Sequence, residues 1–222
     1  MWASHKVGVW LELRKLAESM KGTTTIGVVC QDGVVLATDT RVTMGTFVAS
    51  KRGKKVFKID DHLAMTIAGV VAEAQNVVDI LKANARLFRL DKGRSMPVKA
   101  ATRLAANILF SSRAFPLAMQ AIIGGMDKTG VHIYALDPFG SVTEETCVST
   151  GSGSPIAYGV LEAEYKKDMP ISDGISMVIR AISSSMKRDA GSGDSFDVVV
   201  VTKKGYYELS EGEKKKVIEL KE

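Results

Sequence analysis

The sequence predicts an α+β fold in which helices cover antiparallel sheets, and two observations favour this class. Runs of apolar and β-branched residues alternate with helical stretches in the order strands, two helices, strands, two helices, strands. The strands are joined by connections of hairpin length, which antiparallel pairing allows and parallel pairing does not. The chain has 222 residues, enough for one large domain that buries a substantial core.

The first strands follow Gly22. Residues 23–30 and 34–38 are β-branched and apolar, and the turn residues between them predict a β-hairpin. Residues 40–50 are a strand or a loop with a break at Gly45. Further strands are predicted over residues 56–59 and 63–68.

Two pairs of helices and the remaining strands complete the chain. The helices are predicted over residues 71–90, from Pro97 to about residue 112, over 156–167 and over 172–187. Ser172 or Asp173 is the expected N-cap of the last of these helices. The strands are predicted over residues 118–124, 131–136, 142–149, 196–202 and 206–209, and the charged tail from Glu211 is helical or frayed.

Composition excludes several function classes. The formal charge of +5 is spread along the chain without a basic stripe interleaved with aromatics, so we expect no nucleic-acid site. Cys30 and Cys147 lie far apart, which argues against a disulfide framework and fits a reducing cytoplasm. His5, His62 and His132 stand alone, so we expect no metal or other cofactor. No apolar run reaches the roughly 18 residues that a membrane span needs.

The N-terminal segment predicts one amphipathic helix over residues 7–20. Glu12, Arg14 and Lys15 interrupt its apolar character, whereas a secretory signal has an uncharged core. The pattern alone does not distinguish an ordinary terminal helix from a segment with a separate role.

Four groups of residues are polar where a strand-rich core is expected to be apolar. They are residues 22–25, residues 38–41, residues 53–55, and the loops that hold Ser152 and residues 189–192. Each alone has an ordinary explanation, since threonines are common in strands and Gly-Ser loops are usually turns. Their order along the chain is more informative than any one of them.

Six motifs carry a resemblance to a known family. They are TTTIGV at 23–28, ATDTRVT at 37–43, GKK at 53–55, MTIAG at 65–69, STGSGSP at 149–155 and RDAGSG at 188–193. This ordered set resembles the β subunits of archaeal proteasomes, from residue 23 to about residue 202. The resemblance implies a four-layer sandwich, two antiparallel sheets between two helical layers, which is the fold of the N-terminal-nucleophile hydrolases.

The resemblance implies that Thr23 is a catalytic nucleophile. Residues 1–22 are then a propeptide removed by autolysis between Gly22 and Thr23, and residues 23–222 are a single catalytic domain. A threonine hydroxyl needs a base beside it, and a freed α-amine with an ordinary pKa of roughly 7.7–8 can serve. While Gly22 is attached, the same nitrogen belongs to an amide and cannot act as a base.

The resemblance also assigns supporting roles. Lys55 would stabilise developing negative charge on the Thr23 oxygen, and Asp39 would hold that lysine charged and aimed. Gly69 would direct its backbone N–H at the oxyanion of the tetrahedral intermediate. Arg41 is a supporting position. The polar residues expected near the threonine amine and a catalytic water are Ser152, Asp189 and Ser192.

By position, a substrate pocket is implied beside the nucleophile. Val42, Gly53, Ile67 and Val71 would line it, and all are neutral. An apolar pocket leaves a buried charge unpaired, so we expect cleavage after hydrophobic residues.

The implied function is a threonine endopeptidase of the proteasome core particle, which degrades unfolded proteins to peptides in the cytoplasm. Its implied partners are α subunits and other β subunits in stacked seven-membered rings, together with an ATP-dependent unfoldase. The alternative is a non-catalytic β-type subunit that only builds the ring. The sequence also leaves open the bacterial two-ring protease relative, which the 149–155 and 188–193 motifs oppose, and another amidohydrolase of the same fold.

Overall fold

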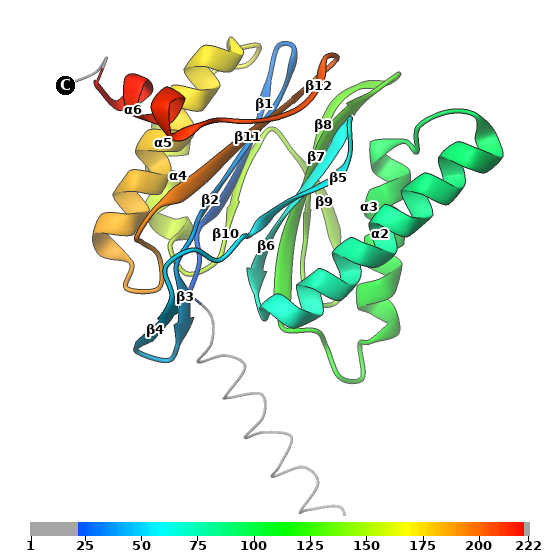
Figure 1. Ribbon diagram of the computed structural model, residues 1–222, viewed down its shortest axis with the longest axis horizontal. Helices are drawn as coiled ribbons and strands as arrows, with labels where there is room; N and C mark the ends of the chain where they lie inside the picture. The colour runs from blue at the N-terminus through cyan, green and yellow to red at the C-terminus, as the bar shows by residue number, and fades with distance from the viewer. Residues whose placement is uncertain (1–21, 220–222) are drawn as a thin grey trace, which may run out of the picture.

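The computed structural model describes residues 22–219, which form two facing five-stranded antiparallel sheets (Figure 1). The first sheet has the order β10-β1-β2-β11-β12, and the second has the order β5-β6-β7-β8-β9. The strands of the first sheet are β1 (Thr25–Cys30), β2 (Gly33–Asp39), β10 (Cys147–Thr150), β11 (Phe196–Thr202) and β12 (Gly205–Glu208). Those of the second are β5 (Val56–Asp60), β6 (Leu63–Gly69), β7 (Met119–Asp127), β8 (Gly130–Leu136) and β9 (Val142–Glu145).

Helices cover the outer face of each sheet, which confirms the predicted α+β class (Figure 1). On the second sheet lie α2 (Val71–Lys92) and α3 (Val98–Ser111), and on the first lie α4 (Ser154–Glu164) and α5 (Ile171–Arg188). The short helix α6 (Glu211–Glu219) follows β12 and packs beside α5. The layers therefore run helices, sheet, sheet, helices, as the resemblance implied.

Three apolar clusters hold the layers together. One joins α2 and α3 to the second sheet, and another joins α4 and α5 to the first sheet. The third lies between the two sheets, where Leu36, Ile122 and Ile133 are completely buried. Burial of each such side chain contributes about 1.5–3 kcal/mol to folding. Strands buried on both faces account for the nearly continuous apolar runs in the sequence.

Two predictions about local structure are wrong. The single strand expected over residues 142–149 is two strands, because the chain bends at Thr146 and passes from the second sheet to the first. The N-cap of α5 is Pro170 rather than Ser172 or Asp173, and neither of those side chains caps the helix. Pro170 has an extended backbone, and α5 begins at Ile171, directly after it.

The segment over residues 40–50 is a hairpin of its own. It consists of β3 (Val42–Met44) and β4 (Phe47–Ser50), with Gly45 at a positive φ of 61° in the turn. The helix predicted over residues 7–20 lies outside the described residues. Between residues 22 and 219, no helix combines the length and the hydropathy that crossing a membrane requires.

Candidate active site

Thr23 lies two residues before the start of β1, at one end of the first sheet. β1 pairs with β2 so that Thr25 stands opposite Thr38. The backbone N–H of Asp39 donates to the carbonyl of Thr24 at 3.1 Å, which places the end of β2 beside the start of β1. Thr23 is 4% exposed and Asp39 is completely buried. The hairpin thus brings together two polar residues that the sequence separates.

Asp39 is held by four hydrogen-bond donors. Its Oδ1 accepts from the backbone N–H of Thr24 at 2.9 Å and from Nζ of Lys55 at 2.8 Å. Its Oδ2 accepts from the backbone N–H groups of Arg41 at 3.0 Å and Gly193 at 3.1 Å. A buried carboxylate is tolerated only when it is paired and hydrogen-bonded, and both conditions hold here. The orientation of Asp39 is therefore fixed.

Lys55, directly before β5, is the cation that faces this carboxylate. Its side chain is 3% exposed, and its Nζ also lies 3.4 Å from the carbonyl oxygen of Gly22. Burial lowers the pKa of Lys55 below its usual value, and the attraction of Asp39 opposes that change. Burial likewise raises the pKa of Asp39, which Lys55 opposes.

A second polar group lies on the other side of Thr23. Oδ2 of Asp189 accepts hydrogen bonds from the hydroxyls of Ser152 and Ser192, each at 2.6 Å. The backbone N–H of Thr23 donates to Oγ of Ser152 at 3.2 Å, and the hydroxyls of Thr24 and Ser192 are 2.7 Å apart. Ser152 therefore touches the nitrogen that a cut between residues 22 and 23 would convert into an amine.

The peptide bond between Gly22 and Thr23 lies inside this polar site. The hydroxyl of Thr23 donates to the carbonyl oxygen of Gly22, the same oxygen that Lys55 approaches. A Cβ on Gly22 would lie 2.4 Å from Oγ1 of Thr43 and 2.7 Å from Cα of Gly191. Only glycine fits at position 22 without displacing backbone.

Gly69 ends β6 beside Thr23, at a position that requires glycine. Its φ is +123°, and a Cβ would lie 2.1 Å from the carbonyl oxygen of Ala118. Gly151 also requires glycine: its φ is +90°, and a Cβ there would lie 2.2 Å from the carbonyl oxygen of Thr23. The backbone therefore approaches the threonine closely from two directions. The assignment of the Gly69 N–H to an oxyanion stays a prediction.

Two recesses flank Thr23. The first is lined by Val42, Ile67 and Val71, together with Gly22, Thr23, Arg41, Thr43, Lys55 and Gly69. Gly53 does not line this recess; it lies behind Val42, whose Cγ2 fills the space that a Cβ would take. The second recess has a volume of about 300 Å³ and is lined by Gly22, Thr23, Ala68, Gly69, Ala118, Met119, Gln120, Pro138, Gly151 and Ser152.

Arg41 ties the loop after α5 to the end of β2. Its Nε donates to Oδ2 of Asp194 at 2.8 Å, and its Nη1 donates to the carbonyl oxygen of Ala190 at 3.0 Å. Its guanidinium occupies the space where Gly193 would carry a Cβ. Sequence reasoning missed Asp194, although an acidic residue beside the 188–193 motif was a signal for a partner of Arg41. It also missed Thr43 and Gly191, whose packing against Gly22 has no signal in sequence.

These features define the class of the protein. A two-sheet α+β sandwich carries a buried threonine, with a lysine–aspartate pair on one side and a serine–aspartate–serine group on the other. Among residues 22–219 there is no cluster of three or more His, Cys, Asp or Glu side chains that could hold a metal ion. The groups available at the site suit acyl transfer to a hydroxyl.

Comparison with known proteins agrees with this class. The model of the Proteasome family, described as proteasome subunit, matches residues 19–201. The chain is 51% identical over 200 residues to "Proteasome subunit beta" of Ferroglobus placidus, which covers 90% of this chain and 95% of that protein. It is also 51% identical to the proteins of the same name from Methanocaldococcus vulcanius, over 203 residues, and Methanococcoides burtonii, over 191 residues. These alignments cover 90% and 86% of this chain, and 91% of each relative.

The chain belongs to the proteasome subunit family, and its resemblance to archaeal β subunits is confirmed. Membership of this family implies assembly with other proteasome subunits.

Proposed function

We propose that the chain is a threonine endopeptidase subunit of a proteasome core particle, activated by cleavage between Gly22 and Thr23. One observation carries the proposal. The hydroxyl of Thr23 and the Nζ of Lys55 both approach the carbonyl oxygen of Gly22, inside a buried polar site. The nucleophile, the cation and the bond to be cut therefore lie together before any substrate enters.

Activation would begin with attack of Thr23 Oγ1 on the carbonyl carbon of Gly22. The hydroxyl loses its proton to a basic group, and Lys55 stabilises the negative charge that forms on the carbonyl oxygen. The C–N bond then breaks, the nitrogen of Thr23 takes up a proton, and an ester links Gly22 to the threonine oxygen. Water hydrolyses this ester, which releases residues 1–22 as a carboxylate and regenerates the hydroxyl.

The freed α-amine of Thr23 would then act as general base in peptide cleavage. Its nitrogen already lies 3.2 Å from Oγ of Ser152, which in turn donates to Asp189. This contact orients the amine toward the hydroxyl of its own residue. Lys55 adds a positive charge beside the amine, and like charges disfavour the ammonium form. Both effects keep the amine available as a proton acceptor near neutral pH.

Hydrophobic side chains are the substrate residues that the first recess would accept once its walls move apart, because its volume here is about 10 Å³, roughly the space of one water molecule. Val42, Ile67 and Val71 contribute only apolar surface to it. A charged substrate side chain would lose its hydration there without gaining a free partner, because the two cations in the lining, Lys55 and Arg41, are already paired with Asp39 and Asp194. We therefore propose cleavage after hydrophobic residues.

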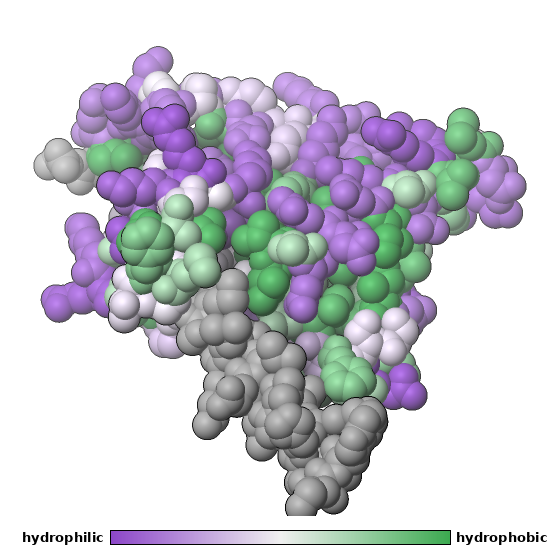
Figure 2. Space-filling view, turned by 60° about the horizontal axis from the view of Figure 1, so that its bottom comes forward, coloured by the Kyte–Doolittle hydropathy of each residue, from purple (hydrophilic) through white to green (hydrophobic). Residues whose placement is uncertain are grey.

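The proposed setting is a particle of stacked seven-membered rings in the cytoplasm, built with α subunits and other β subunits and supplied by an ATP-dependent unfoldase. Unfolded proteins are the proposed substrates, because a threonine inside a chamber is accessible only to extended chains. Figure 2 brings forward the end of the molecule that carries β3 and β4, and it shows hydrophobic residues gathered on this face. Met44 and Phe47 of the hairpin are 57% and 68% exposed, which suits a surface covered in an assembly.

The alternative, a ring-building subunit without activity, has less support. Such a chain has no need to bury Lys55 and Asp39, because a buried ion pair contributes little to stability. It has equally little need for a glycine at position 22.

The test is intact mass spectrometry after mixing the chain with a matching α subunit. Loss of residues 1–22 is expected for the unchanged chain, and their retention is expected for Thr23→Ala, together with loss of peptidase activity. Thr66→Ala is the matched control, because Thr66 is a buried threonine whose hydroxyl has no hydrogen-bond partner in the described chain. Full peptidase activity in Thr23→Ala would refute the proposal.

A further inference from the structure

A cleft of about 950 Å³ lies at the end of the sandwich opposite the candidate active site. Its lining includes Thr202 at the end of β11, which pairs with Gly33 at the start of β2. The other end of β2, at Asp39, is the end beside Thr24. The length of a strand therefore separates this cleft from Thr23, and none of its lining residues belongs to the site described above.

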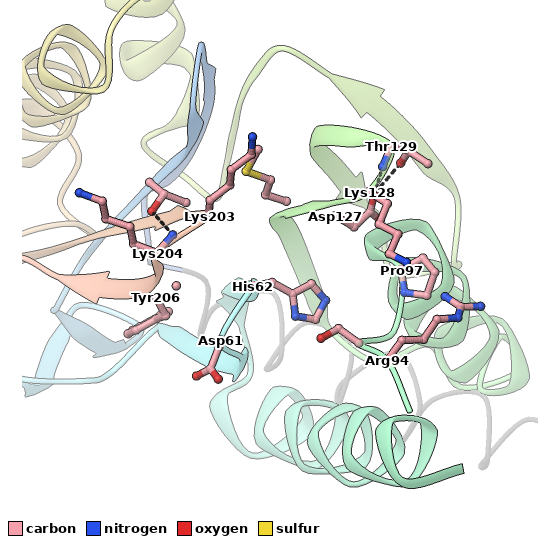
Figure 3. A pocket seen from close by; sticks show the side chains of 14 residues that line it. Asp61, His62, Arg94, Pro97, Asp127, Lys128, Thr129, Lys203, Lys204 and Tyr206 are labelled. Carbon is pink, nitrogen blue, oxygen red and sulfur yellow. Dashed lines mark hydrogen bonds between the residues drawn. The ribbon is translucent and has the colours of Figure 1, made fainter. Parts of the chain in front are cut away.

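The cleft has two walls that come from different sheets. On one side in Figure 3 lie Lys203 and Lys204, from the turn between β11 and β12, and Tyr206, from β12. Arg94, from the loop between α2 and α3, and Lys128, from the turn between β7 and β8, lie on the other side. Each wall therefore carries its own pair of cations.

The negative charges in the cleft are already engaged by the protein. Asp61 forms an ion pair with Lys58 at 2.7 Å. Asp127 accepts hydrogen bonds from the backbone N–H groups of Val98 and Thr129, each at 2.8 Å. Neither carboxylate lies within ion-pair distance of a cation on the two walls.

The cations, in contrast, have no acidic partner within the described part of the chain. Lys128, Lys203 and Lys204 are exposed and form no ion pair with any residue from 22 to 219. Arg94 faces the ring of Phe88, at 5.1 Å from its centroid. The lining of the cleft therefore carries four cations and two carboxylates, and one of these carboxylates, Asp61, is paired with Lys58 outside the lining. Its net charge is positive, and a ligand that fits it is negatively charged.

We propose that this cleft binds an acidic, extended peptide segment of a partner protein. The cations stand on opposite sides of the cleft, and an extended peptide with several carboxylates can reach both sides. The cleft also offers apolar surface from Pro97, Met126 and Tyr206, which suits the side chains between the carboxylates. The proposal is independent of the peptidase activity, because no residue of the cleft lies near Thr23.

The direct test uses a fluorescein-labelled peptide of alternating glutamate and leucine, with binding measured by fluorescence anisotropy. The protein carries Thr23→Ala, which leaves the cleft intact and prevents cleavage of the probe at the proposed active site. We expect binding that weakens as salt is added, and much weaker binding of the same peptide with glutamine in place of glutamate. Lys203→Glu with Lys204→Glu should weaken binding about tenfold or more, since both charges change sign.

Two further variants make the test specific. Arg94→Glu, on the opposite wall, should also weaken binding, because the proposed ligand reaches both walls. Lys166→Glu with Lys167→Glu is the matched control, since these are two neighbouring exposed lysines in the loop between α4 and α5. The proposal is overturned if the control weakens binding as much as the cleft variants, or if Arg94→Glu has no effect. It is also overturned if inorganic tripolyphosphate binds while the acidic peptide does not.

Discussion

Nζ of Lys55 lies 2.8 Å from Oδ1 of Asp39, and both side chains are almost completely removed from solvent. Water therefore cannot solvate either charged group, and each depends on the other for its electrostatic stabilisation. The pair therefore works as a unit that carries a cation to the carbonyl oxygen of Gly22. The role of the pair is to position the Lys55 cation rather than to stabilise the fold, because buried ion pairs rarely stabilise a fold more than apolar side chains of similar size.

The first prediction follows from this burial. Asp39→Asn should lower the free energy of unfolding by about 3–5 kcal/mol, because it leaves the Lys55 ammonium buried without a counter-ion. The double variant Asp39→Asn with Lys55→Met should be less destabilised than Asp39→Asn alone, because the unpaired charge is then gone. Urea unfolding followed by circular dichroism measures both quantities.

Lys54, the neighbour of Lys55, provides the control for this first prediction. Its side chain is 44% exposed, and it pairs with Glu208 and, at 3.5 Å, with Asp197. Lys54→Met should change the free energy of unfolding by no more than about 1 kcal/mol. If Lys54→Met lowered the free energy of unfolding as much as Asp39→Asn does, burial of the charge would not explain the effect of Asp39→Asn.

The second prediction concerns the residue before the nucleophile. Gly22→Ala should slow release of residues 1–22 about tenfold or more, which corresponds to about 1.4 kcal/mol of added barrier. The reason is that the new Cβ meets Cα of Gly191, which is backbone and cannot rotate away. A time course of intact mass, started by adding α subunits, measures the rate.

The control for Gly22→Ala is a glycine with open space around it. Gly159 lies within α4, and nothing stands within 4 Å of where its Cβ would be. Gly159→Ala should leave processing unchanged and stabilise the chain by up to about 1 kcal/mol, because alanine favours helix. Unchanged processing in Gly22→Ala would contradict the proposed close packing around the cut bond.

Most of the fold could be predicted from the sequence because periodicity reports burial. The strand over Phe196–Thr202 was predicted with its observed bounds, since its apolar run is buried on both faces. The division of residues 142–149 into β9 and β10 could not be predicted in this way. Both strands are short, and no periodicity in sequence tells that one pairs with β8 and the other with β1.

The candidate site was predictable only where residue type carries chemistry. Thr23, Asp39 and Lys55 belong to motifs, and the structure brings these side chains into one buried site. Gly53 was expected to line the substrate pocket, but the structure places it behind Val42 instead. Contacts such as Gly22 against Gly191 arise from tertiary packing between distant segments, so no local pattern reports them.

The third prediction tests the proposed preference for hydrophobic residues. Val71 lines the first recess and is the first residue of α2, where an acidic side chain also interacts well with the helix dipole. Val71→Asp should raise cleavage after arginine relative to leucine about tenfold, because the new carboxylate pairs with the substrate cation. A fluorogenic peptide panel on the assembled enzyme measures this ratio. Val71→Leu, which keeps the recess apolar, should leave the ratio unchanged, and an equal change in both variants would locate the specificity elsewhere.

The fourth prediction concerns pH and the C-terminal helix. Ser210 and Glu213 form a capping box at the start of α6, where the backbone N–H of Ser210 donates to Oε2 of Glu213 at 2.8 Å. Hydrogen bonds from the hydroxyl and backbone of Ser210 and from the hydroxyl of Tyr207 lower the pKa of Glu213 from 4.5 to about 2. A pKa that is lower in the folded state stabilises α6 above the unfolded value, and this stabilisation is lost as pH falls toward the folded value.

We therefore expect α6 to loosen as the pH falls from about 4.5 to about 2, while it stays formed at neutral pH. Carboxyl-carbon NMR titration of Glu213 measures the pKa, and amide hydrogen exchange in α6 reports the loosening. Glu213→Gln is the control, because it keeps the size of the side chain and removes the titration. A Glu213 that titrates at its ordinary pKa, or equal acid sensitivity of α6 in the glutamine variant, would mean that the capping box does not hold this helix.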